Sequence, residues 1–279
     1  MSDDPQLSVL GEATEGVHAD DDRDPFDQSG FRIRFDWGPM GMRRLAPLAD
    51  VVVIIDVLSF TTCVDVALGQ GAIVLPYRWN NGTEEAFAAE HGAELAVPRR
   101  EVDDTHPWSL SPTRLSQIPA GTRLVLPSPN GAALAFGAAA AGTRTVMAAC
   151  LRNASAVAQV ISQSPDAPGV VAVIAAGERW KSTTGPLRPA VEDLLGAGAV
   201  IAALAPYTDD SLSPEASVAA AAWAAHADDL ELILLRTGSG RELAGAGYGP
   251  DVLLAAEVDV SRIAPVLTGP AFVDGNPAR

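Results

Sequence analysis

Apolar residues along the chain fall into two alternating kinds of segment. Short runs rich in β-branched residues, of which 51–55 is the clearest, are too short for helices, and the Ala-rich segments between them are too long for strands. A continuous Val/Ile run without polar alternation is typical of a strand that is covered on both faces. The alternation predicts an α/β fold with a layered α/β/α arrangement and largely parallel or mixed sheets.

Turn-forming and helix-capping residues between these segments give the expected order of elements. Strands are expected at 51–55, 72–77, 123–126, 145–149, 170–175 and 251–256. Helices are expected at 63–68, from Thr83 to His91, at 131–141, after Asn153, from about Ala190 and within 214–235. The segment 98–119 is rich in Pro, Ser and charge, so it is expected either to cover a cleft or only to connect two elements.

Charge and internal similarity suggest how the chain is divided. Up to Asp27, nine acidic residues stand against one arginine, and this net charge of −8 is half of the formal net charge of −16. With few large apolar residues, residues 1–30 are predicted to be a disordered acidic tail. Residues 31–149 and 150–279 are predicted to form two similar α/β lobes, because 51–55 and 170–174 each lead through a polar loop to a helix. Generic α/β composition would produce the same likeness without a repeat.

Composition excludes several classes of protein. A net charge of −16 argues against binding a nucleic-acid backbone, which requires clustered Lys and Arg. The chain lacks both a long unbroken apolar stretch and a basic signal segment, so it is expected to be cytoplasmic and not membrane-bound. Cys63 and Cys150 lie in apolar segments and are expected to be buried free thiols. The four histidines show no zinc-ligand spacing.

Candidate chemistry lies in three loops that follow predicted strands, at 56–62, 128–131 and 177–193. Asp56 follows five apolar residues, so its carboxylate must be compensated by a metal, a cation or N–H donors. Magnesium prefers one or two carboxylates with water, and Glu178, Glu192 and Asp193 are the nearest acids of similar placement. Two alternatives remain open: Asp56 serves only as a helix cap, and the acids at 192 and 193 are favoured by the helix dipole alone.

The second of these loops has two interpretations. Asn130 and Gly131 form either a plain turn or helix cap, or a backbone cradle for phosphate in which Gly131 allows close approach.

The three loops together resemble the 2-phosphosulfolactate phosphatase family, from about Phe35 onward. The matching stretches, in order, are Val53-Ile54-Ile55-Asp56-Val57-Leu58 with Thr61-Thr62, Ser128-Pro129-Asn130-Gly131, Ala176-Gly177, Glu192-Asp193 with Gly196-Ala197-Gly198, and Gly240-Arg241-Glu242-Leu243. The resemblance implies an α/β hydrolase that uses Mg2+ to cleave the phosphate ester of a small acid with carboxylate and sulfonate groups, a reaction of coenzyme M biosynthesis. The expected partner is a small anionic phosphorylated substrate, and a homodimer is the expected assembly.

The resemblance also implies roles for individual residues. Asp56, Glu192 and Asp193 are candidate catalytic acids, and Asp56, Glu178 and Glu192 are candidate metal ligands. Candidate substrate or phosphate contacts are Ser59, Thr61, Thr62, Ser128, Asn130, Gly131 and Arg179. Magnesium would neutralise the phosphoryl oxygens while a carboxylate positions or deprotonates the attacking water.

The chain departs from the family pattern at three positions. Ser59 stands where the family usually has Arg, Ala132 where it has Thr, and Gly196 where Cys is frequent. Loss of the arginine puts the substrate in doubt, because a guanidinium matches phosphate or sulfonate and a serine does not. Arg179, Lys181 or Arg188 would restore positive charge, or these are solvated loop cations.

Two other functions remain open. In an aspartyl-nucleophile phosphatase Asp56 itself would attack phosphorus, but such sites commonly carry a second acid two residues on, where this chain has Leu58. A non-catalytic homologue that binds an anion is the other alternative. From the sequence, Asp56→Asn is predicted to abolish magnesium-dependent phosphate release while the fold stays intact.

Overall fold

The protein is described by a computed structural model that covers residues 24–78, 82–164, 169–180, 185–208 and 211–276. The strands are β1 Ile33–Trp37, β2 Val51–Ile55, β3 Ile73–Arg78, β4 Glu94–Leu95, β5 Arg123–Ser128, β6 Thr145–Ala149, β7 Val171–Ala175, β8 Glu178–Arg179, β9 Leu187–Arg188, β10 Pro265–Thr268 and β11 Ala271–Asp274. The helices are α1 Gly38–Leu45, α2 Phe60–Gly69, α3 Glu84–Glu90, α4 Pro112–Leu115, α5 Gly131–Ala140, α6 Ala154–Ser162, α7 Val191–Leu204, α8 Pro214–His226, α9 Leu230–Arg236, α10 Gly238–Gly245 and α11 Gly249–Ala255.

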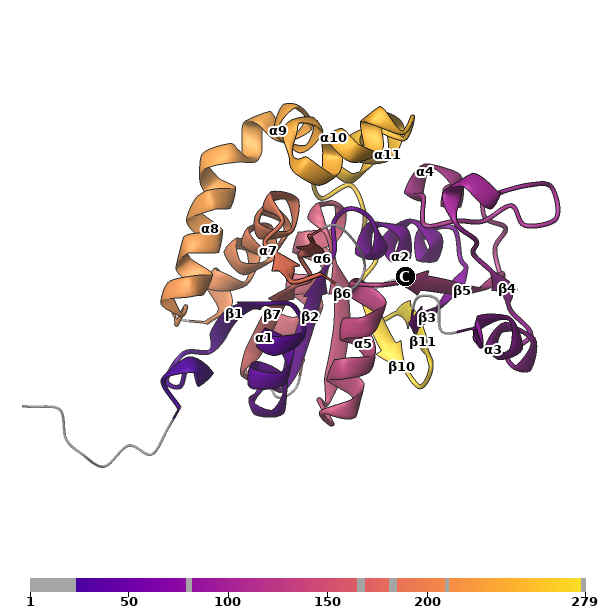
Figure 1. Cartoon of the computed structure of the whole chain (residues 1–279). Coiled ribbons are helices and arrows are strands. Elements are labelled where there is room, and N and C mark those ends of the chain that lie inside the picture. Colours follow the sequence, from indigo (N-terminus) through magenta and orange to yellow (C-terminus); the bar gives the residue numbers. More distant parts are fainter. Residues whose placement is uncertain (1–23, 79–81, 165–168, 181–184, 209–210, 277–279) are drawn as a thin grey trace, which may run out of the picture.

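One large sheet organises the molecule, in the order β1-β7-β2-β6-β10-β11-β3-β5-β4 (Figure 1). On one side, β1, β7, β2 and β6 are parallel, and on the other β3, β5 and β4 are parallel. The hairpin of β10 and β11 joins the two groups through antiparallel pairs with β6 and β3. Three successive antiparallel pairings reverse the direction three times, so the two parallel groups run in opposite senses.

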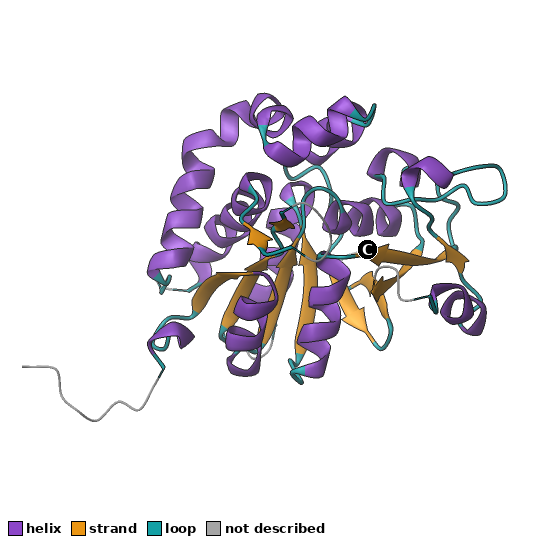
Figure 2. Cartoon of the chain, viewed as in Figure 1, coloured by secondary structure: helices purple, strands orange, loops and turns teal. Residues whose placement is uncertain are grey.

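Helices cover both faces of the sheet (Figure 2). Alternate residues of the strands face opposite sides, so Val53 and Ile55 of β2 pack with helices α6, α7, α8, α9 and α11. Val52 and Ile54 of the same strand pack on the other face, where α1, α2 and α5 contribute the buried side chains. Strands that are buried on both faces read as continuous apolar runs. The predicted layered α/β/α fold is confirmed.

The predicted boundary between residues 149 and 150 does not separate two sheets. Strand β7, from the second predicted lobe, lies between β1 and β2 and pairs with both along their full lengths. The two similar runs that suggested a repeat are therefore neighbours in one sheet, with Val51 opposite Val171. The break in the parallel pattern falls instead at the β10–β11 hairpin.

The strand predicted at 251–256 is wrong, because these residues belong to helix α11. Pro250 lies in the first turn, where its missing N–H costs nothing, and this favours a helix start. Val252, Ala255 and Ala256 are buried, whereas Leu253 is 42 % exposed, which is the spacing of a helix face. The other predicted elements are confirmed to within a few residues. No counterpart was predicted for the strands β1, β4, β8, β9, β10 and β11 or for the helices α1, α4 and α10.

The predicted acidic tail lies mostly outside the described residues, and its last part has defined structure. Pro25–Asp27 form a short 3-10 helix whose first turn is capped by the side chain of Asp24. Arg34 donates to the carbonyl oxygen of Asp27, 3.0 Å away, and Asp24 also forms an ion pair with Arg44. These contacts tie residues 24–27 to the α/β body, so the prediction of disorder up to residue 30 is wrong for this part.

Two further sequence predictions can be compared with the structure. Cys63 and Cys150 are both buried and unbonded, as predicted, and burial raises the pKa of each thiol. In the part of the chain that is described, no helix is both long enough and apolar enough to cross a bilayer.

Candidate active site

Asp56 lies at the carboxyl end of β2 and joins the N-termini of two helices. Its Oδ1 atom accepts a hydrogen bond from the backbone nitrogen of Phe60, 3.3 Å away in the first turn of α2. Its Oδ2 atom accepts one from the backbone nitrogen of Gly131, 2.7 Å away at the start of α5. Asp56 is not the N-cap of the following helix, because Ser59 takes that position in α2 and Asn130 takes it in α5. Its carboxylate instead accepts the first backbone N–H of each helix and so holds both N-termini around it.

The loop that follows Asp56 is held by hydroxyl groups. Thr61 donates its hydroxyl hydrogen to the carbonyl oxygen of Asp56 at 2.9 Å, and Thr62 donates to the carbonyl oxygen of Val57 at 2.8 Å. Both threonines are fully buried. These contacts give the two hydroxyls a structural use, and a direct contact with phosphate stays a prediction.

Asp193 connects the ends of two strands. One carboxylate oxygen accepts from the backbone nitrogen of Val57 at 2.7 Å, and the other from the backbone nitrogen of Gly177 at 2.8 Å. The side chain is 3 % exposed. Because β2 ends at Ile55 and β7 at Ala175, this carboxylate fixes the first turns of both site loops relative to α7. Its catalytic role stays a prediction.

Glu178 and Asn130 meet across the site. The Nδ2 atom of Asn130 donates to the Oε2 atom of Glu178 at 3.1 Å, although 48 residues separate them. The backbone nitrogen of Asn130 lies 3.3 Å from the hydroxyl oxygen of Ser128, which accepts its hydrogen bond. This arrangement brings the 128–131 loop and the third loop together, as the sequence predicted.

Glu192 supplies a buried acceptor that no group of the described residues fills. The residue is 1 % exposed in the first turn of α7, and its Oε2 atom has no hydrogen-bond partner among the residues that the structure describes. A buried carboxylate oxygen without a donor is costly unless a cation or a ligand hydrogen compensates it. Glu192 is therefore the acid in this site with an open position for a ligand.

Burial and, after it, neighbouring negative charge raise the pKa of three acids of the site, Asp56, Glu178 and Asp193. Burial raises the pKa of Asp56 to about 6, opposed by the amides of Phe60 and Gly131 and reinforced by the charge of Glu192. Burial and then the charge of Asp56 raise the pKa of Glu178 to about 7. The same two causes raise the pKa of Asp193. This concentration of negative charge favours a bound cation or a shared proton.

The cationic candidates from the third loop differ in where they point. Arg188 donates to the hydroxyl oxygen of Ser239 at 3.0 Å, and its charge lowers the pKa of Glu178. Arg179 donates to the carbonyl oxygen of Gly185 at 3.0 Å, within its own hairpin of β8 and β9. Lys181 lies outside the described residues. Arg188 is thus the third-loop arginine whose charge acts on the carboxylates, and substrate binding by Arg179 stays a prediction.

Sequence reasoning missed Arg99. This residue lies in the 98–119 excursion, and its guanidinium donates to the Oγ atom of Ser59 at 2.9 Å. Ser59 is the position where the family pattern has an arginine, so a cation from a distant segment stands beside it. The Arg99-Arg100 pair in a Pro-rich excursion was the available signal, but sequence spacing does not show which element such a side chain reaches.

The donor set is compatible with magnesium, which needs only one or two carboxylates and completes its shell with water and substrate oxygens. Within the described ranges, no cluster of three or more His, Cys, Asp and Glu residues forms a ready metal cage. The open Oε2 atom of Glu192 and the raised pKa values of Asp56 and Glu178 are the observations that fit a cation.

Comparison with known proteins decides the family. The sequence model of 2-phosphosulpholactate phosphatase matches residues 42–270, which include every candidate site residue. The chain belongs to the 2-phosphosulfolactate phosphatase family. A probable 2-phosphosulfolactate phosphatase of Thermus thermophilus is 30% identical over 228 residues, covering 79% of this chain and 89% of that protein. One of Deinococcus radiodurans is 31% identical over 234 residues, covering 78% and 88%.

Membership of the 2-phosphosulfolactate phosphatase family confirms the resemblance seen in the sequence. The two relatives are matched over most of their own length, so the likeness extends beyond the site loops to the sheet and helices that hold them. Ser59 stands where the family pattern has an arginine, and the guanidinium of Arg99 donates to the hydroxyl oxygen of this serine.

Proposed function

We propose that this chain is a magnesium-dependent phosphatase that hydrolyses 2-phosphosulfolactate, or a closely similar phosphate ester of a small acid, to the free hydroxy acid and phosphate. The observation that carries the proposal is the meeting of Asp56, Gly131 and Glu178 at the ends of three distant strands, in a chain of the phosphatase family. Both relatives are described as probable 2-phosphosulfolactate phosphatases, which supports the same substrate here.

The N-terminus of α5 is the proposed position of the phosphate. The backbone N–H of Gly131 already donates to Asp56. The next N–H groups of the first turn have no partner within the helix and point in the same direction. Such N–H groups and the helix dipole favour an anion. Close approach there requires glycine, because a Cβ atom at residue 131 would lie 2.8 Å from the Oδ2 atom of Asp56.

Glu192 is the proposed magnesium ligand, with Asp56 nearby. When bound, the ion would neutralise phosphoryl oxygens and help to ionise a water molecule. The open oxygen of Glu192 supports this assignment, and the two amide contacts of Asp56 leave its carboxylate less free for an ion. The same two contacts disfavour Asp56 as the nucleophile of the alternative mechanism.

Glu178 is the proposed proton carrier. A carboxyl group with a pKa of about 7 is present in both protonation states at neutral pH, which suits general acid–base chemistry. In hydrolysis the water oxygen bonds to phosphorus, the ester P–O bond breaks, and the proton released by water ends on the leaving oxygen. Asn130 holds the Glu178 carboxylate by one oxygen and leaves the other for this transfer.

The experiment is phosphate release by the purified protein from 2-phosphosulfolactate, with Mg2+ and with a chelator. We expect release with Mg2+, loss of release with the chelator, and loss in Glu192→Gln. Ligand-induced thermal stabilisation without release would instead identify a non-catalytic anion-binding homologue. Release that is unaffected by the chelator would reject the role of magnesium while leaving the phosphatase assignment standing.

A place in coenzyme M biosynthesis, a cytoplasmic location and a homodimer belong to the same proposal. Cell fractionation would test the location, and sedimentation of the purified protein would test the number of subunits.

A further inference from the structure

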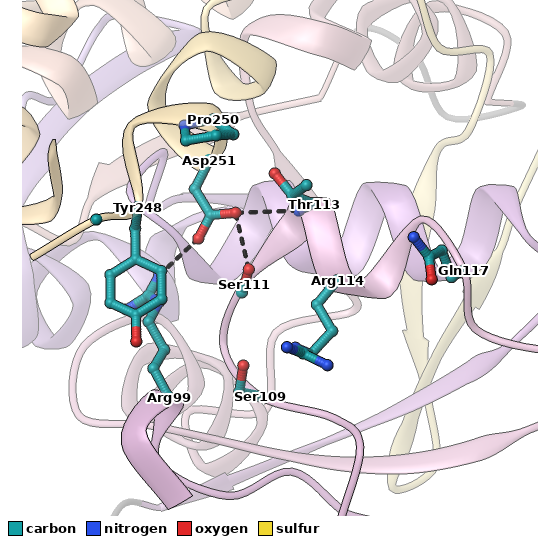
Figure 3. A pocket seen from close by; sticks show the side chains of 10 residues that line it. Arg99, Ser109, Ser111, Thr113, Arg114, Gln117, Tyr248, Pro250 and Asp251 are labelled. Atoms are coloured by element: carbon teal, nitrogen blue, oxygen red, sulfur yellow. Dashed lines mark hydrogen bonds and ion pairs between the residues drawn. The ribbon is translucent and has the colours of Figure 1, made fainter. Parts of the chain in front are cut away.

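A polar cavity lies beside the Asp56 loop, between the 98–119 excursion and α11. Its volume is about 390 Å³, and Figure 3 shows the side chains that line it. The residues that matter are Arg99, Ser109, Ser111, Arg114, Tyr248 and Asp251. These side chains bring two guanidinium groups, three hydroxyls and one carboxylate into one cavity, where they offer contacts to a small polar ligand. Apolar pockets of similar size instead select for hydrophobic ligands.

Arg99 is held in this cavity from three directions. Its guanidinium donates to the Oγ atom of Ser59 at 2.9 Å and stacks over the ring of Tyr248, with 5.1 Å between the guanidinium carbon and the ring centroid. One terminal nitrogen lies 3.5 Å from the Oδ2 atom of Asp251. Its Nε atom is buried and has no hydrogen-bond partner among the described residues. A fixed fork with an unused donor is suited to an incoming carboxylate or sulfonate.

Asp251 presents an unused acceptor to the same cavity. The residue is 2 % exposed. Its Oδ1 atom accepts from the hydroxyl of Ser111 at 2.8 Å and from the backbone nitrogen of Thr113 at 3.2 Å. Its Oδ2 atom faces Arg99 but has no hydrogen bond within the described ranges. A ligand that carries both an acidic group for the arginines and an O–H donor for Asp251 would satisfy both open positions.

The cavity adjoins the loop of the candidate active site. Arg99 contacts Ser59, and Ser59 is three residues from Asp56 in the loop that leads into α2. The buried Cys63 lies one helical turn further along, where the charges of Arg99, Asp251 and Asp56 all act on its thiol. Arg99 therefore links the cavity to the loop that leads from Asp56 into α2.

We propose that this cavity binds the acidic end of the substrate and of the released hydroxy acid, with Arg99 as a specificity-determining residue. The proposal rests on the function proposed above, because it assumes that the substrate is a small acid with a second anionic group. Arg99 and Arg114 bind the sulfonate or carboxylate, and Asp251 accepts a hydrogen bond from an O–H group of the ligand.

Calorimetric titration with sulfolactate, which carries no phosphate, tests the cavity independently of catalysis. We expect Arg99→Gln to weaken binding about tenfold or more, the usual effect of losing a hydrogen bond to a charged group. Arg114→Gln removes the second positive charge without touching Asp251, and it is expected to weaken binding severalfold. The matched control is Arg100→Gln, because Arg100 is 88 % exposed and its change should alter binding less than about twofold.

Kinetics separate recognition from folding and from the chemical step. With 2-phosphosulfolactate, Arg99→Gln should raise KM much more than it lowers kcat, while turnover of glycerol phosphate, which has no second acid, should change little. Arg99→Lys keeps the charge but loses the fork, and it should restore part of the affinity.

Several outcomes would overturn the proposal. Failure of the wild-type protein to bind sulfolactate, or binding by Arg99→Gln at wild-type strength, rejects the cavity as an acid site. If circular dichroism shows that Arg99→Gln is unfolded, unchanged binding by Arg114→Gln rejects it instead. Absence of phosphate release together with Arg99-dependent binding of sulfolactate would reject the phosphatase function but support the cavity.

Discussion

The Oδ2 atom of Asp56 lies 2.7 Å from the backbone nitrogen of Gly131, 75 residues further along the chain. The two residues follow β2 and β5, which belong to the two oppositely directed groups of the sheet. Their hydrogen bond is thus a direct link between the two groups at the candidate active site. Substitutions at this link and at the acids around it are therefore expected to affect both the stability of the fold and its chemistry.

Asp56→Asn should abolish phosphate release and also destabilise the fold. Asparagine has one acceptor oxygen for the two amides of Phe60 and Gly131, so we expect a loss of about 1–3 kcal/mol in the free energy of unfolding. Urea denaturation and a phosphate assay measure the two effects. Asp50→Asn is the control, because Asp50 accepts from the amide of Val170 at the other end of β2. Turnover by Asp56→Asn equal to that of Asp50→Asn would exclude Asp56 from the site.

Asp193→Asn should act mainly on stability. Its carboxylate bonds to the amides of Val57 and Gly177, and one of these would face an amide NH2 group in the variant. We expect a loss of about 1–3 kcal/mol in unfolding free energy. Well below its melting temperature, the folded variant should keep turnover within about tenfold of wild type. A loss as complete as that of Asp56→Asn would instead place Asp193 in the chemistry.

Gly131→Ala should disrupt the junction of α2 and α5. The added methyl group would contact the ring of Phe60 and lie 2.8 Å from the Oδ2 atom of Asp56. We expect a loss of about 1–3 kcal/mol in stability, as for other overpacked sites, together with loss of activity. Gly137→Ala in the same helix is the matched control, since its methyl group would meet only the flexible side chain of Met42 at 3.3 Å. Equal behaviour of the two variants would contradict the close approach at Gly131.

Stability in the absence of metal should fall as pH rises. The folded-state pKa values of Glu178 and Asp56, about 7 and about 6, lie above the ordinary values of 4.5 and 3.8. Between these limits Glu178 and Asp56 bind more protons in the folded state than in the unfolded state, so their contribution to the unfolding free energy decreases from about pH 4 to about pH 7.

Glu178→Gln should flatten this dependence by about 3 kcal/mol across the range, because a shift of one pKa unit corresponds to about 1.4 kcal/mol. Urea unfolding at several pH values with chelator present measures the slope. Glu231→Gln, on the exposed side of α9, is the control and should leave the slope unchanged. A steeper slope in Glu178→Gln, or an increase of stability with pH, would contradict the raised pKa of Glu178.

Glu192→Gln should remove the response to magnesium. In the wild-type protein, Mg2+ at about ten times its dissociation constant should add about 1.4 kcal/mol to the unfolding free energy, and the melting temperature should rise by a few degrees. The variant lacks the open carboxylate oxygen, so its melting temperature should not change with Mg2+. Exposed Glu215 gives the control variant Glu215→Gln. If Mg2+ raises the melting temperature of Glu192→Gln as much as that of the wild type, the ion binds elsewhere.

Much of the local structure could be predicted because it is encoded by short-range chemistry. The Val/Ile run of β2 marks a buried strand, and Thr83 and Asn153 mark helix starts that the structure confirms. The same reasoning gave the wrong element for 251–256. This apolar run is short, and a short apolar run is compatible with a strand or with part of a buried helix. Pro250 was the signal that favoured a helix.

The three loops follow strands, as predicted, but the direction of those strands was not. β5 belongs to the group that runs opposite to β2, although the loops after both strands meet at the site. Strand order depends on long-range pairing, which a single sequence does not report. The contacts of Arg99 with Ser59 and Asp251 escaped prediction for the same reason, since 40 and 152 residues separate them.

The β10–β11 hairpin has a consequence for how the protein is made. It follows every other strand of the large sheet in chain order, yet it fills the middle positions between β6 and β3. During synthesis, the two flanking groups of strands must therefore wait with unpaired inner edges until residues 265–274 have left the ribosome. The sheet is completed only when the β10–β11 hairpin pairs with β6 and β3. A nascent chain that stalls before this point would therefore expose the unpaired edges of β6 and β3, which chaperones could bind.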